Sequence, residues 1–130
     1  MFGITLEGND AIHEQLSKGI KKLVLTGVLQ KDSPLPSVRE LALDLAINPN
    51  TVQKAYAFLE QQGITYSVSG KGRFVAIDAD GLKVMAQNDI IAGITPEILE
   101  LKNLGMSLDE LKAKIEKIYK EGNKWLKLKT

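Results

Sequence analysis

The chain has 130 residues, contains no cysteine and one histidine, and balances 17 lysines and arginines against 16 aspartates and glutamates. This composition excludes disulfides and thiolate catalysis, leaves too few ligands for a metal site, and suits one compact domain or a small domain with an appendage. No apolar run approaches the ~18 residues of a membrane-spanning helix, and the N-terminus lacks the order of a signal peptide, so we expect a cytoplasmic protein with no membrane partner.

An extended segment over residues 1–9 precedes the first predicted helix. From Asp10 onward, apolar side chains recur every three or four residues, which is typical of an amphipathic helix. Asn9 or Asp10 can accept hydrogen bonds from the first free amides, and Gly27 can adopt the left-handed conformation that ends the helix. The apolar stripe consists of Ile12, Leu16, Ile20, Leu23 and Val24.

Two further helices follow, each with its own start signal. Ser37 and Glu40 form the pattern of a capping box, which predicts a short second helix. Asn48 is a good N-cap, Pro49 is favoured at the first helical position, and Gly63 marks the end of this third helix. The predicted buried positions are Val38, Leu41, Ala42 and Leu45 in the second helix and Val52, Ala55, Tyr56 and Leu59 in the third.

A β-hairpin is predicted after the third helix. Residues 64–68 and 73–77 are rich in strand-forming side chains, and the intervening Ser69-Gly70-Lys71-Gly72 supplies a flexible, charged tip. Three helices followed by a hairpin form the order of a winged helix-turn-helix. The predicted fold is therefore mostly α-helical with a small β-hairpin, and residues 1–78 make up the winged domain.

The remaining residues, 79–130, read as helical. Thr95-Pro96 either starts a fresh helix or kinks a longer one, and Ser107 with Glu110 forms another capping box before a last helix that runs to about Glu121. Two helices of this size cannot bury their apolar faces against each other alone. We therefore expect a two-helix tail that pairs with a second copy of the chain.

The polar side chains of the winged domain suit contact with DNA. In this motif the third helix enters the major groove, where Asn and Gln pair with adenine, Thr meets a thymine methyl group and Lys reaches guanine or phosphate. An arginine on the second helix can grip guanine, and tip glycines allow close approach to phosphate or the minor groove. The candidate DNA-binding residues are Ser37, Arg39, Asn48, Asn50, Thr51, Gln53, Lys54, Ser69, Gly70, Lys71, Gly72 and Arg73.

Each candidate also has a structural interpretation. Ser37 and Asn48 are caps, the polar side chains of the third helix fit an ordinary solvated face, and Gly70 and Gly72 fit a simple turn. Residues 1–78 hold eight basic and eight acidic side chains, so bulk charge does not favour DNA. A winged-helix protein-interaction module without DNA specificity is therefore the alternative function.

Three segments in order resemble the DNA-binding domain of the GntR family of bacterial regulators: PSVRELA (36–42), NPNTVQKAYAFLEQQG (48–63) and SGKGRFV (69–75). The resemblance covers about residues 4–77. It implies that Arg39 reads guanine, that Asn50, Thr51 and Gln53 contact the groove, and that the wing around Gly70 touches the minor groove. The chain departs from the family in lacking a glycine before Pro36, and it has Gln53 where some members have arginine.

The short helical tail resembles that of the YtrA-type members of this family, in which the tail is a dimerisation unit. The resemblance implies a homodimeric transcription repressor on a palindromic, double-stranded DNA operator. It implies neither an enzyme nor a cofactor, and it leaves open whether a small-molecule effector exists.

Lysines gather near the C-terminal end of the chain, with Trp125 among them. We expect a solvated helix face with Trp125 packed in the dimer; contact with flanking DNA phosphates is an alternative, and a membrane-surface anchor is disfavoured by the small apolar area of Trp125-Leu126. These lysines are Lys112, Lys114, Lys117, Lys120, Lys124, Lys127 and Lys129.

Overall fold

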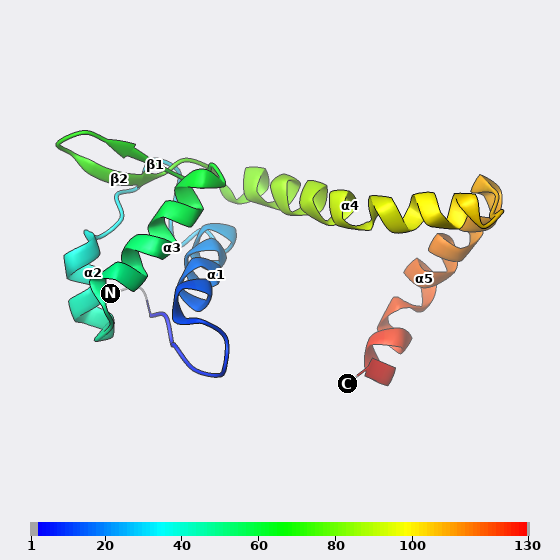
Figure 1. Cartoon of the computed structure of the whole chain (residues 1–130), viewed down its shortest axis with the longest axis horizontal. Helices are drawn as coiled ribbons and strands as arrows, with labels where there is room; N and C mark the ends of the chain where they lie inside the picture. The colour runs from blue at the N-terminus through cyan, green and yellow to red at the C-terminus, as the bar shows by residue number, and fades with distance from the viewer. Residues whose placement is uncertain (1–2, 130) are drawn as a thin grey trace. The chain divides into compact units, whose positions relative to one another are not determined.

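The computed structural model describes residues 3–129, and it describes side chains for residues 3–122 and 124. Residue contacts divide the chain into a first unit that ends at Gln87 and a second that begins at Asn88. The helices and strands are α1 (Ile12–Leu25), α2 (Val38–Leu45), α3 (Pro49–Gln61), β1 (Thr65–Val68), β2 (Gly72–Val75), α4 (Ala79–Asn103) and α5 (Leu108–Lys129) (Figure 1). The order of three helices and a hairpin is that of a winged helix-turn-helix, as predicted.

The core of the first unit lies where α3 packs against α1 and α2. The predicted buried stripes of α1 and α3 are confirmed, except that Ile12 is exposed and Leu23 only packs at the edge of the core. In α2, Leu41 and Ala42 are buried, while Val38 and Leu45 pack against the core from its edge. The buried members of the two long stripes are Leu16, Ile20, Val24, Val52, Ala55, Tyr56 and Leu59.

The helix boundaries follow the predicted caps with one exception. The Ser37 hydroxyl accepts a hydrogen bond from the Glu40 amide at 3.1 Å, and Asn48 Oδ1 accepts one from the Asn50 amide at 2.8 Å. Gly27 and Gly63 both have φ +80°, the left-handed conformation that ends a helix.

The predicted cap of α1 by Asn9 or Asp10 is wrong. The N-cap residue is Ala11, whose side chain makes no capping hydrogen bond. The carbonyl of Asp10 accepts a hydrogen bond from Gln15 Nε2 at 2.7 Å, and its carboxylate lies 4.0 Å from the Lys18 ammonium. Asp10 therefore contacts side chains of α1 and does not cap the first backbone amides of that helix.

The hairpin is antiparallel, and its ends differ by one or two residues from those predicted. Thr65 pairs with Val75 and Val68 with Gly72. The segment before α2 runs along β2: the Leu35 amide donates to the Arg73 carbonyl at 2.8 Å, and the Val75 amide donates to the Ser33 carbonyl at 2.9 Å. The open edge of β2 is thus hydrogen-bonded to the chain that leads into α2.

The first turns of α4 belong to the first unit, which the sequence did not predict. Asp78 Oδ1 caps the helix by accepting a hydrogen bond from the Gly81 amide at 2.7 Å. Leu82 is buried in the core, and Met85 packs against it. A Cβ at Gly81 would lie 2.7 Å from Ile77 Cγ1, so a side chain there would disturb this packing. The compact unit therefore extends beyond residue 78, where the winged motif itself ends.

In the second unit, α4 continues through Thr95-Pro96, so a fresh helix at Pro96 is wrong. The Thr95 hydroxyl donates to the Ile91 carbonyl at 2.6 Å, while Pro96 has no amide proton to offer within the helix. Gly105 ends the turn region with φ +93°, and the Ser107 hydroxyl accepts from the Glu110 amide at 3.1 Å, which confirms the predicted cap.

The last helix, α5, extends to Lys129, beyond the predicted end near Glu121. Lys112, Lys114, Lys117, Lys120 and Lys124 are exposed, and the Lys120 ammonium lies 2.9 Å from a Glu116 carboxylate oxygen. The side chains of Trp125, Lys127 and Lys129, for which packing or phosphate contact was expected, lie outside the described residues. Within residues 3–129, no helix is long and apolar enough to cross a membrane.

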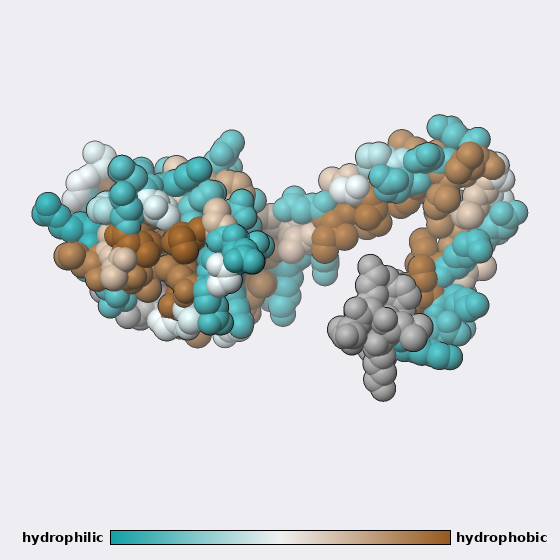
Figure 2. Space-filling view, turned by 60° about the horizontal axis from the view of Figure 1, so that its bottom comes forward, coloured by the Kyte–Doolittle hydropathy of each residue, from teal (hydrophilic) through white to brown (hydrophobic). Residues whose placement is uncertain are grey.

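Large apolar side chains of the second unit are exposed on both of its helices and in the turn between them. Figure 2 shows hydrophobic surface along parts of α4 and α5. Ile94 and Ile115 are each 42% exposed, and Ile118 is 64% exposed. The full set is Ile90, Ile91, Ile94, Leu99, Leu104, Leu108, Ile115, Ile118 and Tyr119.

Candidate nucleic-acid interface

The N-terminal half of α3 presents a polar face to solvent. Asn50, Gln53 and Lys54 are exposed and lie three and four residues apart, so they share one side of the helix. The buried stripe of α3 lies on the opposite side, and Thr51 is half-buried between the two. The core therefore fixes which side chains α3 can offer to a base edge.

Ser37 and Asn48 serve as caps, as their structural interpretation predicted. In each, a side-chain oxygen accepts a hydrogen bond from a backbone amide, with a donor–acceptor distance of 3.1 Å for Ser37 and 2.8 Å for Asn48. The Ser37 hydroxyl proton and the Asn48 amide NH₂ remain as donors on the exposed starts of α2 and α3. Both helix starts also concentrate amide dipoles, which favour a phosphate group nearby.

Arg39 lies on the first turn of α2 and is exposed. Its guanidinium carries five donors in a planar fork that matches guanine O6 and N7. Because the core holds α2 against α3, Arg39 and the polar face of α3 belong to the same rigid helix pair. This pairing is what a helix-turn-helix needs to read adjacent bases.

The wing tip consists of exposed residues with room around their backbone. Gly70 has φ +76° and Gly72 has φ +111°, which side chains rarely adopt, and a Cβ at either glycine would meet no atom within 4 Å. The turn conformation therefore selects glycine, and the space around it is open. Ser69 and Lys71 are exposed beside these glycines.

A groove of about 300 Å³ separates the wing from the start of α2. The groove brings together four of the candidate residues: Ser37 from the start of α2, and Lys71, Gly72 and Arg73 from the wing. Its lining residues are Leu35, Pro36, Ser37, Val38, Glu40, Tyr56, Lys71, Gly72 and Arg73.

Arg73 differs from the other candidates. It is half-buried, and its guanidinium carbon lies 5.2 Å from the centre of the Tyr56 ring, a cation–π distance. Its Nη1 is inaccessible to solvent and has no hydrogen-bond partner among the described residues. Arg73 therefore lies against the domain, whereas Lys71 extends from the tip.

Tyr56 is buried in the core, as predicted, and it also has a second role that the sequence did not predict. Its hydroxyl donates to the Pro36 carbonyl at 2.8 Å, which ties α3 to the segment before α2. Burial raises the pKa of Tyr56 well above its ordinary value near 10, an effect that Arg73 opposes and Glu40 reinforces. The phenol thus stays neutral and keeps its donor. No single-residue pattern signals this role, because the partner is a backbone carbonyl distant in sequence.

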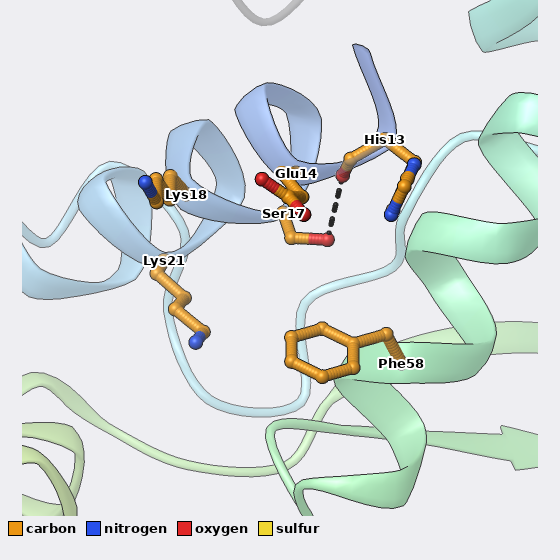
Figure 3. A pocket seen from close by; sticks show the side chains of 6 residues that line it. All are labelled: His13, Glu14, Ser17, Lys18, Lys21 and Phe58. Atoms are coloured by element: carbon orange, nitrogen blue, oxygen red, sulfur yellow. Dashed lines mark hydrogen bonds between the residues drawn. The ribbon is translucent and has the colours of Figure 1, made fainter. Parts of the chain in front are cut away.

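A second hollow, of about 290 Å³, lies between α1 and α3 (Figure 3). The Ser17 hydroxyl donates to the His13 carbonyl at 2.9 Å, and the Lys21 ammonium lies 5.4 Å from the centre of the Phe58 ring. Lys18 is near Asp10, as described above. These polar groups are thus engaged within the protein, and the residues that the structure describes include no cluster suited to a metal ion. His13 is half-buried.

Known proteins match this arrangement. A sequence model of bacterial regulatory proteins of the gntR family matches residues 12–75. The transcriptional repressor YtrA of Bacillus subtilis (strain 168) is 34% identical over 119 residues, which are 91% of this chain and 92% of YtrA. The chain belongs to the GntR family.

Solved structures resemble the chain as well. A transcriptional regulator from Oenococcus oeni, 35% identical, covers 92% of this chain and 99% of its own, with a TM-score of 0.60. The N-terminal domain of AraR, solved in complex with mutant ORR3, is 31% identical over 54% of this chain and 100% of its own, with a TM-score of 0.51. This GntR protein is therefore a DNA-binding transcription regulator and not an enzyme.

Proposed function

We propose that this GntR regulator is a homodimeric repressor that binds a palindromic operator in the cytoplasm. Residues 1–78 would contact DNA, and residues 79–130 would hold two copies together. The observation that carries the proposal is the exposed polar face of α3, held by the core beside Arg39 of α2. Similarity to the YtrA repressor over nearly its whole length supports repression in particular.

Base readout is assigned to the helix pair. Asn50 and Gln53 offer amides that pair with adenine, Thr51 offers its methyl group to thymine, and Lys54 reaches guanine or phosphate. Arg39 is assigned to guanine because its exposed fork suits two acceptors at once. These contacts specify sequence, whereas contacts to phosphate set position.

Backbone contacts are assigned to the helix starts and the wing. The N-terminal amides of α2 and α3 suit phosphates, and the wing tip combines one cation with glycines that permit close approach. The residues of this set are Ser37, Asn48, Ser69, Gly70, Lys71 and Gly72.

Dimerisation is inferred from the apolar faces of α4 and α5. Side chains such as Ile94, Ile115 and Ile118 leave a larger apolar surface open than a monomer in water usually shows. A second copy is the simplest cover, since a twofold interface brings the same faces together. A twofold dimer in turn presents two recognition helices to two half-sites in inverted orientation.

Selection from a random DNA pool tests the proposal. The purified full chain should enrich inverted repeats, and binding to them should weaken as salt rises. A scrambled duplex of equal length and base composition is the matched control. If no sequence is enriched and binding does not depend on salt, the protein-interaction module, which the neutral winged domain would also suit, becomes the better assignment.

A further inference from the structure

Three segments of the first unit meet at Arg73. Its guanidinium carbon lies 5.2 Å from the centre of the Tyr56 ring on α3. Its main-chain carbonyl accepts a hydrogen bond from the Leu35 amide at 2.8 Å, in the segment before α2. The Tyr56 hydroxyl closes the set by donating to the Pro36 carbonyl at 2.8 Å. The wing, the recognition helix and the start of α2 are thus joined through two side chains.

We propose that Arg73 is a positioning residue that fixes the wing relative to α3, and that it does not itself contact DNA. The inference rests on the proposed function, in which the wing and α3 bind one DNA duplex together. Through Tyr56 and Leu35, Arg73 sets where the exposed tip at Lys71 lies relative to the polar face of α3.

The burial of Arg73 argues against a direct grip on phosphate or guanine. Such a grip uses two guanidinium nitrogens in parallel. Nη1 of Arg73 is inaccessible to solvent, and the Tyr56 ring covers one face of the group. Arg39 and Lys71, by contrast, are exposed. With Nη1 buried, the fork that Nη1 and Nη2 form is not available to DNA while the side chain lies on the ring.

The wing needs such an anchor because it has only two strands. An isolated two-stranded hairpin is marginally stable in water. Two further contacts support this wing. Within it, the rings of Tyr66 and Phe74 stack with their centres 5.5 Å apart. The Tyr66 hydroxyl also anchors it to the segment before α2 by donating to Asp32 Oδ1 at 2.8 Å. The hairpin should therefore remain folded when Arg73 is replaced, and the effect should be a looser wing.

Amide hydrogen exchange on the free protein tests the anchor without DNA. Arg73→Ala should speed exchange at the Leu35 and Val75 amides by about fivefold, in line with the loss of one cation–π contact. Lys71→Ala is the matched control, because it removes a neighbouring exposed cation and should leave these rates unchanged. Equal rates in Arg73→Ala and the wild type would overturn the proposal.

Titration of a selected operator at several salt concentrations tests the consequence. Arg73→Ala should lower affinity about fivefold for each protomer at every salt concentration, while Lys71→Ala, which removes two phosphate contacts from a dimer, should reduce the slope of log K against log salt by about 1.8. A slope reduced by Arg73→Ala as much as by Lys71→Ala would show that Arg73 touches phosphate, and would overturn the proposal. If the wild type binds no operator, the proposed function fails, whereas the exchange experiment still decides whether Arg73 anchors the wing.

Discussion

We expect the strongest base contact from Arg39. It is exposed on the first turn of α2, and its fork suits guanine. Arg39→Ala should weaken operator binding by about 1–3 kcal/mol and change binding to random DNA much less, because only the specific site presents the matching base. Fluorescence anisotropy titration measures both. Lys22→Ala, which removes an exposed cation from α1, is the control; an operator affinity equal in wild type and Arg39→Ala would refute the assignment.

Tyr56 makes stability depend on pH at the alkaline end. Burial raises the pKa of Tyr56 in the folded protein above its ordinary value near 10. Below pH 10 the phenol is neutral in both states, so its contribution is fully present; above pH 10 the unfolded chain loses a proton that the folded chain keeps, and stability falls by about 1.4 kcal/mol per pH unit.

Urea unfolding between pH 8 and 11 in wild type and Tyr56→Phe isolates this effect. The variant lacks the ionising group, so its free energy of unfolding should fall less steeply above pH 10 than that of the wild type. All other ionisable groups are the same in both proteins, so their contributions cancel in the difference. Parallel curves would show that Tyr56 does not titrate differently in the two states.

For single residues, the sequence predicted those roles that depend on neighbours along the chain. The caps by Ser37, Asn48 and Ser107 follow from local hydrogen-bonding patterns, and all three are present. The roles of Asp10 and Arg73 depend on side chains brought near by folding. For Asp10 these are Lys18 and Gln15 of the helix; for Arg73 the partner is a ring on another helix.

The exposed apolar side chains of α4 and α5 lead to a prediction about dimerisation. Burying the remaining 42% of Ile94 and of Ile115 against a second copy would contribute about 0.6–1.3 kcal/mol for each side chain. The double variant Ile94→Glu with Ile115→Glu should therefore be monomeric at concentrations where the wild type is a dimer. Sedimentation velocity measures the two masses.

Ala92→Glu with Ala113→Glu is the matched control for this variant. Both alanines are exposed on the same helices, about half a turn away from the isoleucines, so the added charge is equal while Ile94 and Ile115 stay intact. This control should remain dimeric. A wild-type monomer, or an isoleucine variant that still dimerises, would contradict the assigned interface.

Helix periodicity predicted the winged motif well, because its core stripes repeat along each helix and its caps are strong. It predicted α4 less well. The burial of Leu82 in the first unit depends on packing against residues far away in the chain, and Pro96 lies inside a helix that a local rule would break. The hairpin ends shifted because the chain before α2 pairs with β2, a tertiary contact that no strand pattern shows.

For the molecule as a whole, charge limits how DNA is bound. Among the proposed contacts, the exposed cations assigned to reach phosphate are Lys54 and Lys71, hence four in a dimer. At about 0.9 counterions released per phosphate contact, the slope of log K against log salt should be about −4. A slope near −10 would require phosphate contacts outside this set.

In the proposed dimer, two winged domains bind one palindrome together. The most direct measurement is the mass of the complex with a selected operator, compared with that of a duplex carrying one half-site, by sedimentation equilibrium. We predict two chains on the full palindrome and a markedly lower affinity for the half-site. One chain per operator, bound equally well to the half-site, would contradict it.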